Sequence, residues 1–208
     1  MKTAALIFLV SALPVQAEIR SAYVAGGCFW CVEADFESVK GVQEVISGYS
    51  GGMVQNPTYK QVAGGSTGHF EAVEIRYDPA QVSYAEIMRL FLRSIDPLDD
   101  SGQFCDRGSP YRTAIFVSDA EERRQAEAAI GEAEQNLGQD VVTPVLPLNK
   151  FWPAEEYHQD YYKGDNLILT RGGPKRQAEA YEYYRKGCGR DERVKAVWGA
   201  DAPFAKTH

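Results

Sequence analysis

The chain has 208 residues, a formal net charge of −7 at pH 7 and a 44% share of hydrophobic residues. That length suits one domain with an apolar core that needs no disulfide staples. The acidic balance and the lack of any block of lysine and arginine argue against a nucleic-acid binder.

The first seventeen residues predict a cleavable export signal. Lys2 supplies the positive start, an apolar run covers 4–14, and Val15-Gln16-Ala17 offers a cleavage site. The run is too short for a retained transmembrane helix, and the alternative is a buried first strand or helix. We therefore expect a signal peptide over 1–17, a single domain over 18–208, and a periplasmic or secreted protein that is not membrane-bound.

The segment Gly26-Gly27-Cys28-Phe29-Trp30-Cys31 carries the strongest functional signal. Two glycines permit a tight turn, and the stretch 29–39, which lacks Gly and Pro, predicts a helix. Cys28 is then expected at a helix N-terminus, where the helix dipole and free N–H groups favour a thiolate. The segment predicts a nucleophile beside an aromatic wall; an inert buried cysteine and ordinary core aromatics are the alternatives.

The rest of the chain alternates strands and helices without a regular βαβ repeat. This predicts an α+β fold: a small mixed β-sheet with helices packed on it, as a two-layer sandwich with a ferredoxin-like core, and an irregular C-terminal tail. Polar loops are expected over 55–68 and 98–111, and the charged helix is expected on the surface. The predicted strands cover 42–49, 70–77, 113–117 and 141–148 (an edge strand), and the predicted helices cover 84–95 (capped by Ser83), 121–137 (capped by Ser118 or Asp119), 153–163 and 177–186.

Glu71 lies in the alternating stretch 70–77. Alternation places Glu71 on one strand face with Val73 and Ile75. A carboxyl group in apolar surroundings has a raised pKa and can act as a general acid. The alternative is a carboxylate at a strand end that reaches solvent, and His69 is interpreted as a structural loop residue.

Four cysteines, Cys28, Cys31, Cys105 and Cys188, remain after removal of the signal. An even count in an exported protein suggests disulfides, but Cys28 and Cys31 are too close to close a stabilising loop. A Cys-x-x-Cys pair is typical of redox or metal chemistry. One alternative function is a thiol–disulfide oxidoreductase that uses Cys28 and Cys31. A zinc module is disfavoured, because the chain has no second Cys-x-x-Cys or close histidine pair.

An ordered set of motifs resembles a known family. The resemblance is to the peptide-methionine (S)-S-oxide reductases, the A-type methionine sulfoxide reductases, and it runs from about Ala22 to Tyr162. No single motif suffices, but the order of the set is highly specific. The motifs are Gly-Cys-Phe-Trp at 27–30, Gly-Tyr-Ser-Gly-Gly at 48–52, Asn-Pro-Thr-Tyr at 56–59, Gly-His-Phe-Glu at 68–71, Asp-Arg-Gly-Ser-Pro-Tyr-Arg at 106–112 and Ala-Glu-Glu-Tyr-His-Gln-Asp-Tyr at 154–161.

The resemblance implies an oxidoreductase that reduces methionine S-sulfoxide, free or in proteins, and so repairs oxidised proteins. Cys28 would attack the sulfur and become a sulfenic acid, and Glu71 would protonate the oxygen. It further implies hydrogen bonds from Tyr59 and Tyr111 to that oxygen, a methyl pocket formed by Phe29 and Trp30, and substrate orientation by Asp106. Tyr59, Tyr111 and Asp106 come from the resemblance alone.

The resemblance also implies recycling. A second thiol would form an intramolecular disulfide with Cys28, which an external dithiol such as thioredoxin would open, with no metal or prosthetic cofactor. The chain departs from the commoner pattern, because position 31 is Cys where many members have Gly, and Cys105 stands where many have Asn. Cys188, flanked by glycines in an expected flexible tail, is ranked first as the resolving cysteine, Cys31 second and Cys105 third. A monomer is expected.

Overall fold

The structure, a computed structural model, describes residues 18–205, so the predicted signal peptide lies outside the described residues. Its centre is a six-stranded sheet in the order β7-β6-β1-β3-β2-β8. Neighbouring strands are antiparallel except β6 and β7, which are parallel. The strands are β1 (Arg20–Gly26), β2 (Val42–Ser50), β3 (Phe70–Tyr77), β6 (Thr113–Val117), β7 (Val145–Pro147) and β8 (Phe151–Pro153).

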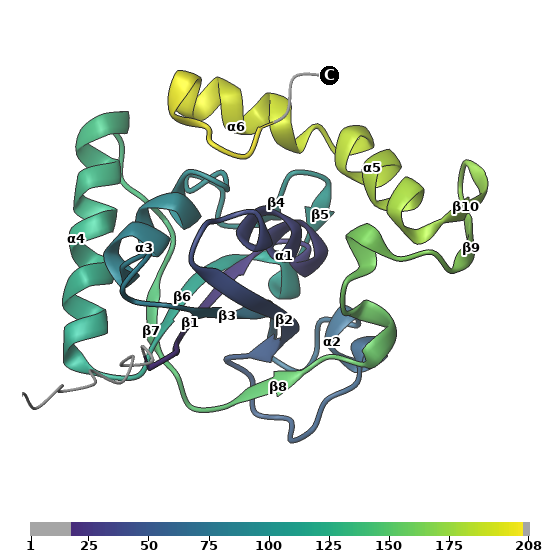
Figure 1. Cartoon of the computed structure of the whole chain (residues 1–208), viewed down its shortest axis with the longest axis horizontal. Helices are drawn as coiled ribbons and strands as arrows, with labels where there is room; N and C mark the ends of the chain where they lie inside the picture. The colour runs from purple at the N-terminus through teal and green to yellow at the C-terminus, as the bar shows by residue number, and fades with distance from the viewer. Residues whose placement is uncertain (1–17, 206–208) are drawn as a thin grey trace, which may run out of the picture.

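Helices cover one face of this sheet (Figure 1). Helix α1 (Phe29–Glu37) contacts β1, β2 and β3, while α3 (Tyr84–Leu92) lies on β1 and against α4 (Ala120–Leu137). The main core between these layers includes Phe36, Ile75, Phe91 and Ile115, all fully buried. The predicted mixed sheet with helices packed on it is confirmed.

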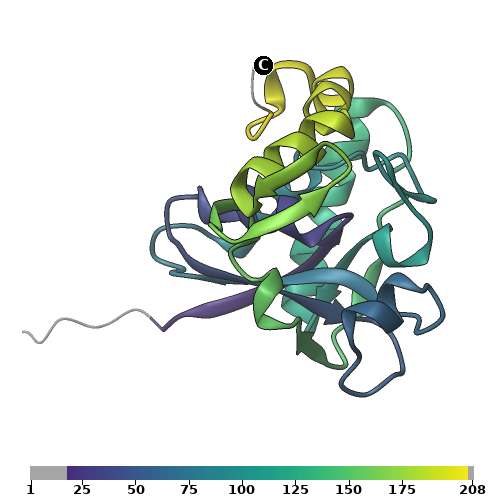
Figure 2. The same cartoon turned by 90° about the vertical axis from the view of Figure 1, so that its right-hand side faces the viewer.

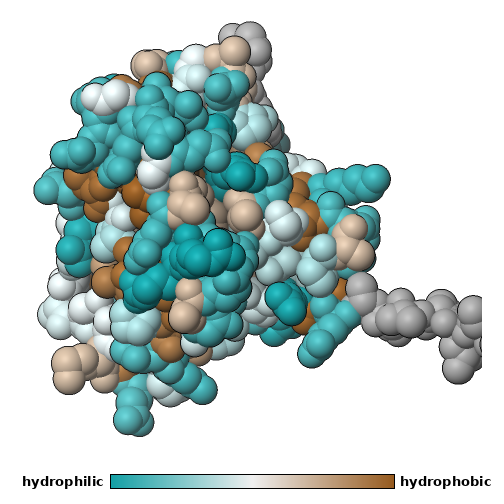
Figure 3. Space-filling view, turned by 90° about the vertical axis from the view of Figure 1, so that its left-hand side faces the viewer, coloured by the Kyte–Doolittle hydropathy of each residue, from teal (hydrophilic) through white to brown (hydrophobic). Residues whose placement is uncertain are grey.

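Helix α4 is the surface helix that its charges predicted. Its buried residues are three alanines, Ala126, Ala129 and Ala133, which allow close packing against α3. The face of the molecule that carries α4 is largely hydrophilic, with separate small apolar spots (Figure 3). Asp119 rather than Ser118 caps the helix, by accepting a hydrogen bond from the Glu122 N–H at 2.8 Å.

The predicted helix over 153–163 was wrong. Pro153 ends strand β8, and two short 3₁₀ turns follow, η2 (Glu156–His158) and η3 (Tyr161–Lys163). Asp160 between them adopts a left-handed φ of 55°, which a continuous α-helix does not allow. The predicted strand 141–148 shortens to β7, which does lie at a sheet edge.

The C-terminal tail was expected to be irregular, and this was wrong as well. Helix α5 (Gln177–Gly187) confirms the helix predicted over 177–186 and contacts α1 through the Arg185–Asp35 ion pair, and the unpredicted helix α6 (Arg190–Trp198) follows it (Figures 1 and 2). Helix α6 forms because Arg190, Val194 and Trp198 recur every four residues and are all buried, which gives the helix one docking stripe. Trp198 Nε1 donates to the Ile95 carbonyl at 3.2 Å.

Shorter elements complete the chain. Strand β1 has no counterpart among the predicted strands, and the two polar loops contain small elements that were not predicted. Within residues 18–205, no helix has the length and apolar character needed to cross a membrane. The remaining elements are α2 (Tyr59–Ala63), β4 (Gly102–Gln103), β5 (Asp106–Arg107), η1 (Ser109–Tyr111), the hairpin of β9 (Leu167–Thr170) and β10 (Gly173–Arg176), and η4 (Gly199–Asp201).

Candidate active site

The register of the sheet brings Cys28 and Glu71 together. Strands β1 and β3 are antiparallel with Val24 opposite Val73, so the end of β1 lies beside the start of β3. The chain leaves β1 at Gly26, turns through Gly27 and enters α1 with Cys28 as the N-cap. Gly27 has a φ of +80°, and a Cβ there would lie 2.6 Å from the Gln103 side chain. The predicted glycine turn and helix start at Cys28 are confirmed.

Cys28 and Cys31 form a hydrogen-bonded thiol pair. Cys31 is the third residue of α1, and its backbone N–H donates to the Cys28 carbonyl at 3.1 Å. The hydrogen bond from Cys28, helped by the charges of Arg190 and Arg185, lowers the pKa of Cys31 to about 7. The same bond, then burial, then Glu71 and Asp106 raise the pKa of Cys28. The lowered pKa that was expected at Cys28 is therefore found at Cys31 instead.

Glu71 is buried beside this pair. Its side chain is 2% exposed, and one carboxyl oxygen accepts a hydrogen bond from the Phe29 N–H at 3.1 Å. Burial raises its pKa to about 8, and the neighbouring Asp106 acts in the same direction. The raised pKa expected from strand alternation is confirmed, and at neutral pH the group carries a proton that it can donate.

Two phenols lie next to Glu71. Tyr59 and Tyr111 are hydrogen-bonded to each other, and burial raises the pKa of both, so they stay neutral donors. Tyr59 opens α2, which Thr58 and Gln61 cap reciprocally. Glu155 holds this helix in place, because its Oε1 accepts from the Tyr59 N–H at 2.9 Å.

The two aromatics after Cys28 have different environments. Phe29 is 1% exposed and packs in the main core against Tyr49, Tyr59 and His158. Trp30 stacks on Tyr161 with ring centroids 3.7 Å apart and is only partly buried. Trp30 is therefore the aromatic available to a ligand, while Phe29 fixes the local packing and binds Glu71 through its N–H.

One cavity of about 530 Å³ collects most of the predicted site residues. Three predicted residues adjoin this cavity without lining it, namely Glu71, Phe29 and Tyr111. Glu71 is hydrogen-bonded to the N–H of Phe29, and Tyr111 to the hydroxyl of Tyr59, which lines the cavity. The cavity is lined by all four cysteines and by Trp30, Tyr59 and Asp106, among others.

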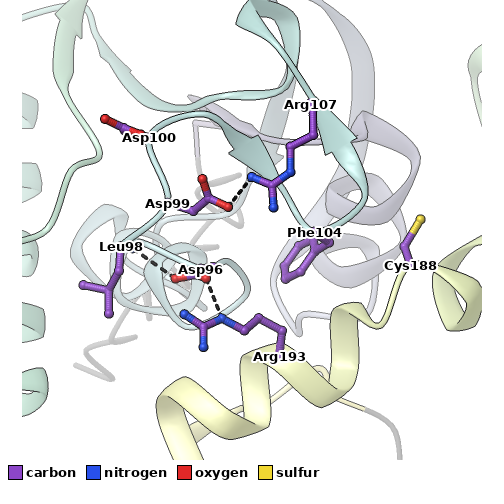
Figure 4. Close-up of a pocket in the computed structure, with 8 residues that line it drawn as sticks. All are labelled: Asp96, Leu98, Asp99, Asp100, Phe104, Arg107, Cys188 and Arg193. Atoms are coloured by element: carbon purple, nitrogen blue, oxygen red, sulfur yellow. Dashed lines mark hydrogen bonds and ion pairs between the residues drawn. The ribbon is translucent and has the colours of Figure 1, made fainter.

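Cys105 and Cys188 are joined by a disulfide, with their Cα atoms 4.9 Å apart. Cys188 is the C-cap of α5 rather than part of a flexible tail, and Cys105 lies in the exposed loop before β5. A second hollow, of about 520 Å³, shares Phe104 and Cys188 with the first cavity. Figure 4 shows Cys188 at one edge of it and the ion pairs Arg193–Asp96 and Arg107–Asp99 on its walls.

The ranking of the resolving cysteines stays a prediction. In the state described, Cys188 is bonded to Cys105, and the free thiol beside Cys28 is Cys31. All three candidates line the same cavity as Cys28, so each lies on a wall that the sulfenic acid would face.

Three residues of the site carried no clear sequence signal. Arg185 and Arg190 line the cavity. The signal that could have found them is their position in the sequence, on either side of Cys188. His158 is 2% exposed, packs against Phe29, Trp30 and Tyr59, and burial lowers its pKa to about 4. It therefore stays neutral, as an apolar neighbour of the site.

His69, by contrast, is structural as predicted. It is buried, its Nδ1 accepts from the Gly52 N–H at 3.1 Å, and its Nε2 lies 2.7 Å from the Val54 carbonyl oxygen.

Comparison with known proteins agrees with this geometry. Residues 20–199 match the family model for peptide methionine sulfoxide reductase. The peptide methionine sulfoxide reductase MsrA 2 of Rhizobium meliloti is 47% identical over 197 residues, which cover 94% of this chain and 92% of the relative.

Solved structures give the same result. The reduced form of Mxr1 from Saccharomyces cerevisiae matches with a TM-score of 0.67 at 27% identity, covering 70% of this chain and 84% of Mxr1. Methionine sulfoxide reductase A of Corynebacterium diphtheriae matches with a TM-score of 0.64 at 28% identity, covering 78% and 86%. The chain belongs to the peptide methionine sulfoxide reductase family, in its A type, and is an oxidoreductase that uses thiols to reduce methionine sulfoxide.

Proposed function

We propose that Cys28 attacks the sulfur of methionine (S)-sulfoxide while Glu71 protonates the sulfoxide oxygen. The attack forms a bond between the two sulfurs. Transfer of the hydroxyl to the Cys28 sulfur then breaks both this bond and the sulfur–oxygen bond, so the substrate leaves as the thioether, reduced by two electrons, and Cys28 is oxidised to a sulfenic acid. The observation that carries the proposal is Glu71, a protonated carboxyl group fixed to the first N–H of α1, directly beside the thiol pair. A protonated oxygen is released from the sulfur more easily than a bare oxide, so this proton lowers the barrier to breaking the sulfur–oxygen bond.

Other residues hold the substrate. Trp30 offers an apolar surface for the S-methyl group on the cavity wall, with Phe29 packed behind it. Tyr59 and Tyr111 donate hydrogen bonds to the oxygen, and Asp106 orients the substrate from the opposite loop. Free methionine sulfoxide and oxidised proteins are both substrates in this proposal, so the enzyme repairs oxidised proteins.

Recycling uses the remaining cysteines. Cys31 is in contact with Cys28 and has the lowered pKa, which supports it as the thiol that condenses first in the state described, with loss of water. Once Cys188 is reduced, its thiol attacks the Cys28–Cys31 disulfide by thiol–disulfide exchange. Alternatively, it attacks the sulfenic acid on Cys28 directly, as expected from its first rank among the resolving cysteines. In either order, the disulfide ends on the C-terminal side of the cavity, where Cys105 is exposed.

A thioredoxin-like protein is the proposed reductant. Another structure of yeast Mxr1 is of its complex with Trx2, which supports a reductant of this kind. The hollow of Figure 4 lies beside the Cys105–Cys188 disulfide and offers an approach to it. We further propose a periplasmic or secreted monomer, after cleavage of residues 1–17, which fractionation and N-terminal sequencing of the mature protein would check.

Replacement of Cys28 tests the central step. We expect Cys28→Ser to abolish single-turnover release of methionine from L-methionine (S)-sulfoxide, measured by chromatography. The matched control is wild-type enzyme with the (R)-sulfoxide, which should not react. Retained turnover in Cys28→Ser would overturn the proposal. A wild-type enzyme that reduces protein disulfides but not the sulfoxide would support the alternative, a thiol–disulfide oxidoreductase.

The resolving cysteine is tested by mass mapping of the disulfide formed after one turnover. Enzyme with the Cys105–Cys188 disulfide intact should yield a Cys28–Cys31 link. For fully reduced Cys188→Ser, we expect the first turnover to survive and thioredoxin-driven recycling to fail. Normal recycling in that variant would assign the whole cycle to Cys31 or Cys105.

A further inference from the structure

Arg190 is an unusual buried charge. It is the first residue of α6, two positions after Cys188. Among the described residues, it has the largest of the fully buried side chains. A charged side chain at 2% exposure is expected to have close partners of opposite charge. Its nearest carboxylate oxygen is Asp35 Oδ2, at 3.7 Å, and its Nε has no hydrogen-bond partner among the described residues.

The neighbouring Arg185 has the partners that Arg190 lacks. Its guanidinium binds Asp35 and Asp191, each at 2.7 Å, and the Tyr181 hydroxyl at 2.8 Å. Asp35 and Asp191 thus engage Arg185 directly. The positive charge of Arg190 faces Asp35 across this longer gap and also acts on Asp106, on a wall of the cavity that contains Cys28 and Cys31.

Arg190 donates hydrogen bonds to two backbone carbonyls, and one of them belongs to the strand end that leads into Cys28. Nη1 donates to the Gly26 carbonyl at 3.2 Å and Nη2 to the Ser94 carbonyl at 2.9 Å. The flat guanidinium also lies over the Phe104 ring, 4.7 Å from its centroid, in the loop that leads to Asp106. Three separate segments of the chain therefore hold the side chain in place. One of them is the end of β1, which leads into the Gly26-Gly27 turn.

We propose that Arg190 is a positioning residue that holds the Gly26-Gly27 turn and supplies the positive charge against which the thiolate of the Cys28–Cys31 pair forms. The proposal rests on the proposed function in that it concerns the same thiols. Charges around the pair are arranged asymmetrically. Arg190 and Arg185 lower the pKa of Cys31 against the opposite effect of Asp35, while Glu71 and Asp106 raise the pKa of Cys28. The groups that face the pair are Asp35 from α1, Tyr59 from α2, Glu71 from β3, Asp106 from β5, Tyr111 from η1, Tyr161 from η3, Tyr181 and Arg185 from α5 and Arg190 from α6.

The test measures the pH dependence of alkylation by iodoacetamide in the full chain with the Cys105–Cys188 disulfide intact. Mass spectrometry then reports the modification of Cys28 and Cys31 separately. We expect Arg190→Gln to raise the midpoint by about one pH unit and to slow alkylation at pH 7 by up to about tenfold. Arg190→Lys, which keeps the charge, should stay close to the wild-type midpoint.

Arg193→Gln is the matched control. Arg193 lies on the same helix, but its charge faces Asp96, at 2.6 Å, on the side of the second hollow. The pH midpoint of alkylation in Arg193→Gln should equal that of the wild type. A folded Arg190→Gln variant with an unchanged midpoint would overturn the proposal, as would equal shifts in the Gln and Lys variants.

A second variant keeps the test decisive if Arg190→Gln does not fold. Asp35→Asn removes the carboxylate that faces both arginines, so the midpoint should move down; an upward shift would contradict the role of the arginine charge. Alkylation needs no turnover. Failure here is therefore separate from failure of the Cys28→Ser test, which concerns the sulfoxide reaction.

Discussion

The two sides of the cysteine cavity differ in charge and in origin. Glu71 and the phenols of Tyr59 and Tyr111 lie on one side, and burial keeps all three neutral and able to donate hydrogen bonds. Arg185 and Arg190 lie on the other side and carry fixed positive charge beside Cys31. Sulfoxide reduction needs a proton at the oxygen and an electron-rich sulfur in the attacking thiol. Separate walls let the protein keep the proton on Glu71 and favour negative charge on the Cys28–Cys31 pair, without the acid neutralising the thiolate.

The two sides are also built by different means. Glu71 is part of a central strand, where backbone hydrogen bonds to β1 and β2 fix its place. The arginines belong to α5 and α6, which dock through buried ion pairs and a few backbone contacts. We therefore expect the acid side to be the rigid one, and the cationic side to respond to changes at the C-terminal helices.

Glu71→Gln breaks the acid side and should have the largest effect. The amide keeps the shape of the side chain but has no acidic proton, so single-turnover reduction should fall about 10²–10⁴-fold. In the wild type, the rate should fall as pH rises through the pKa of Glu71, about 8, because the carboxyl group then loses the proton that it donates. The variant should lose only the alkaline fall. A wild-type alkaline limb that persists in the Gln variant would assign it to another group.

The same variant should alter the pH dependence of stability. Folding raises the pKa of Glu71 from 4.5 to about 8, so between these values the folded state keeps a proton that the unfolded state has lost. Wild-type stability should therefore fall as pH rises through this window, by on the order of 4 kcal/mol, and the Gln variant should lack this fall. Urea unfolding of both proteins at pH 5 and pH 8.5 measures the difference, and Glu86→Gln, an exposed change on α3, serves as the control.

Arg185→Gln breaks the cationic side. The change leaves Asp35 and Asp191 buried without their partner, which should destabilise the chain by about 3–5 kcal/mol. Hydrogen exchange should accelerate in α5 and α6 first and leave β2 and β3 protected. Exchange that accelerates equally in the sheet would show that the two sides unfold together. Arg124→Gln, at an exposed pair on α4, should leave the unfolding curve unchanged.

The acid side was far more predictable from the sequence than the cationic side. The burial of Glu71 follows from strand alternation over eight residues, and the position of Cys28 follows from two glycines and the start of a helix. Local patterns of this kind are visible in a single chain. Tyr59 and Tyr111 were reached only through family resemblance, because their pairing depends on two loops that meet in space.

The cationic side depends on contacts that no local pattern records. Arg190 binds the Gly26 carbonyl across 164 positions of sequence, and its burial requires α6 to fold over α1. The lowered pKa of Cys31 comes first from its hydrogen bond with Cys28 and then from the charges of the docked arginines, and it was expected at Cys28 instead. The wrong helix over 153–163 has a similar origin: Asp160 leaves the helical region because its N–H binds Glu33 on α1, at 2.5 Å.

Thr58→Ala should have the smallest effect and gives the finest measure of how rigid the acid side is. Thr58 caps the five-residue helix α2, and the change removes one half of its capping box, which should cost about 1 kcal/mol. Glu155 still holds the Tyr59 N–H at 2.9 Å, so Tyr59 should keep its place and turnover should fall no more than about threefold. Ser83→Ala removes a comparable cap from α3, away from the cavity, and should lower stability without any change in turnover. If the two variants lose similar stability and Thr58→Ala also loses turnover more than tenfold, the acid side depends on the α2 cap. Its rigidity would then come from a short helix and not from the sheet.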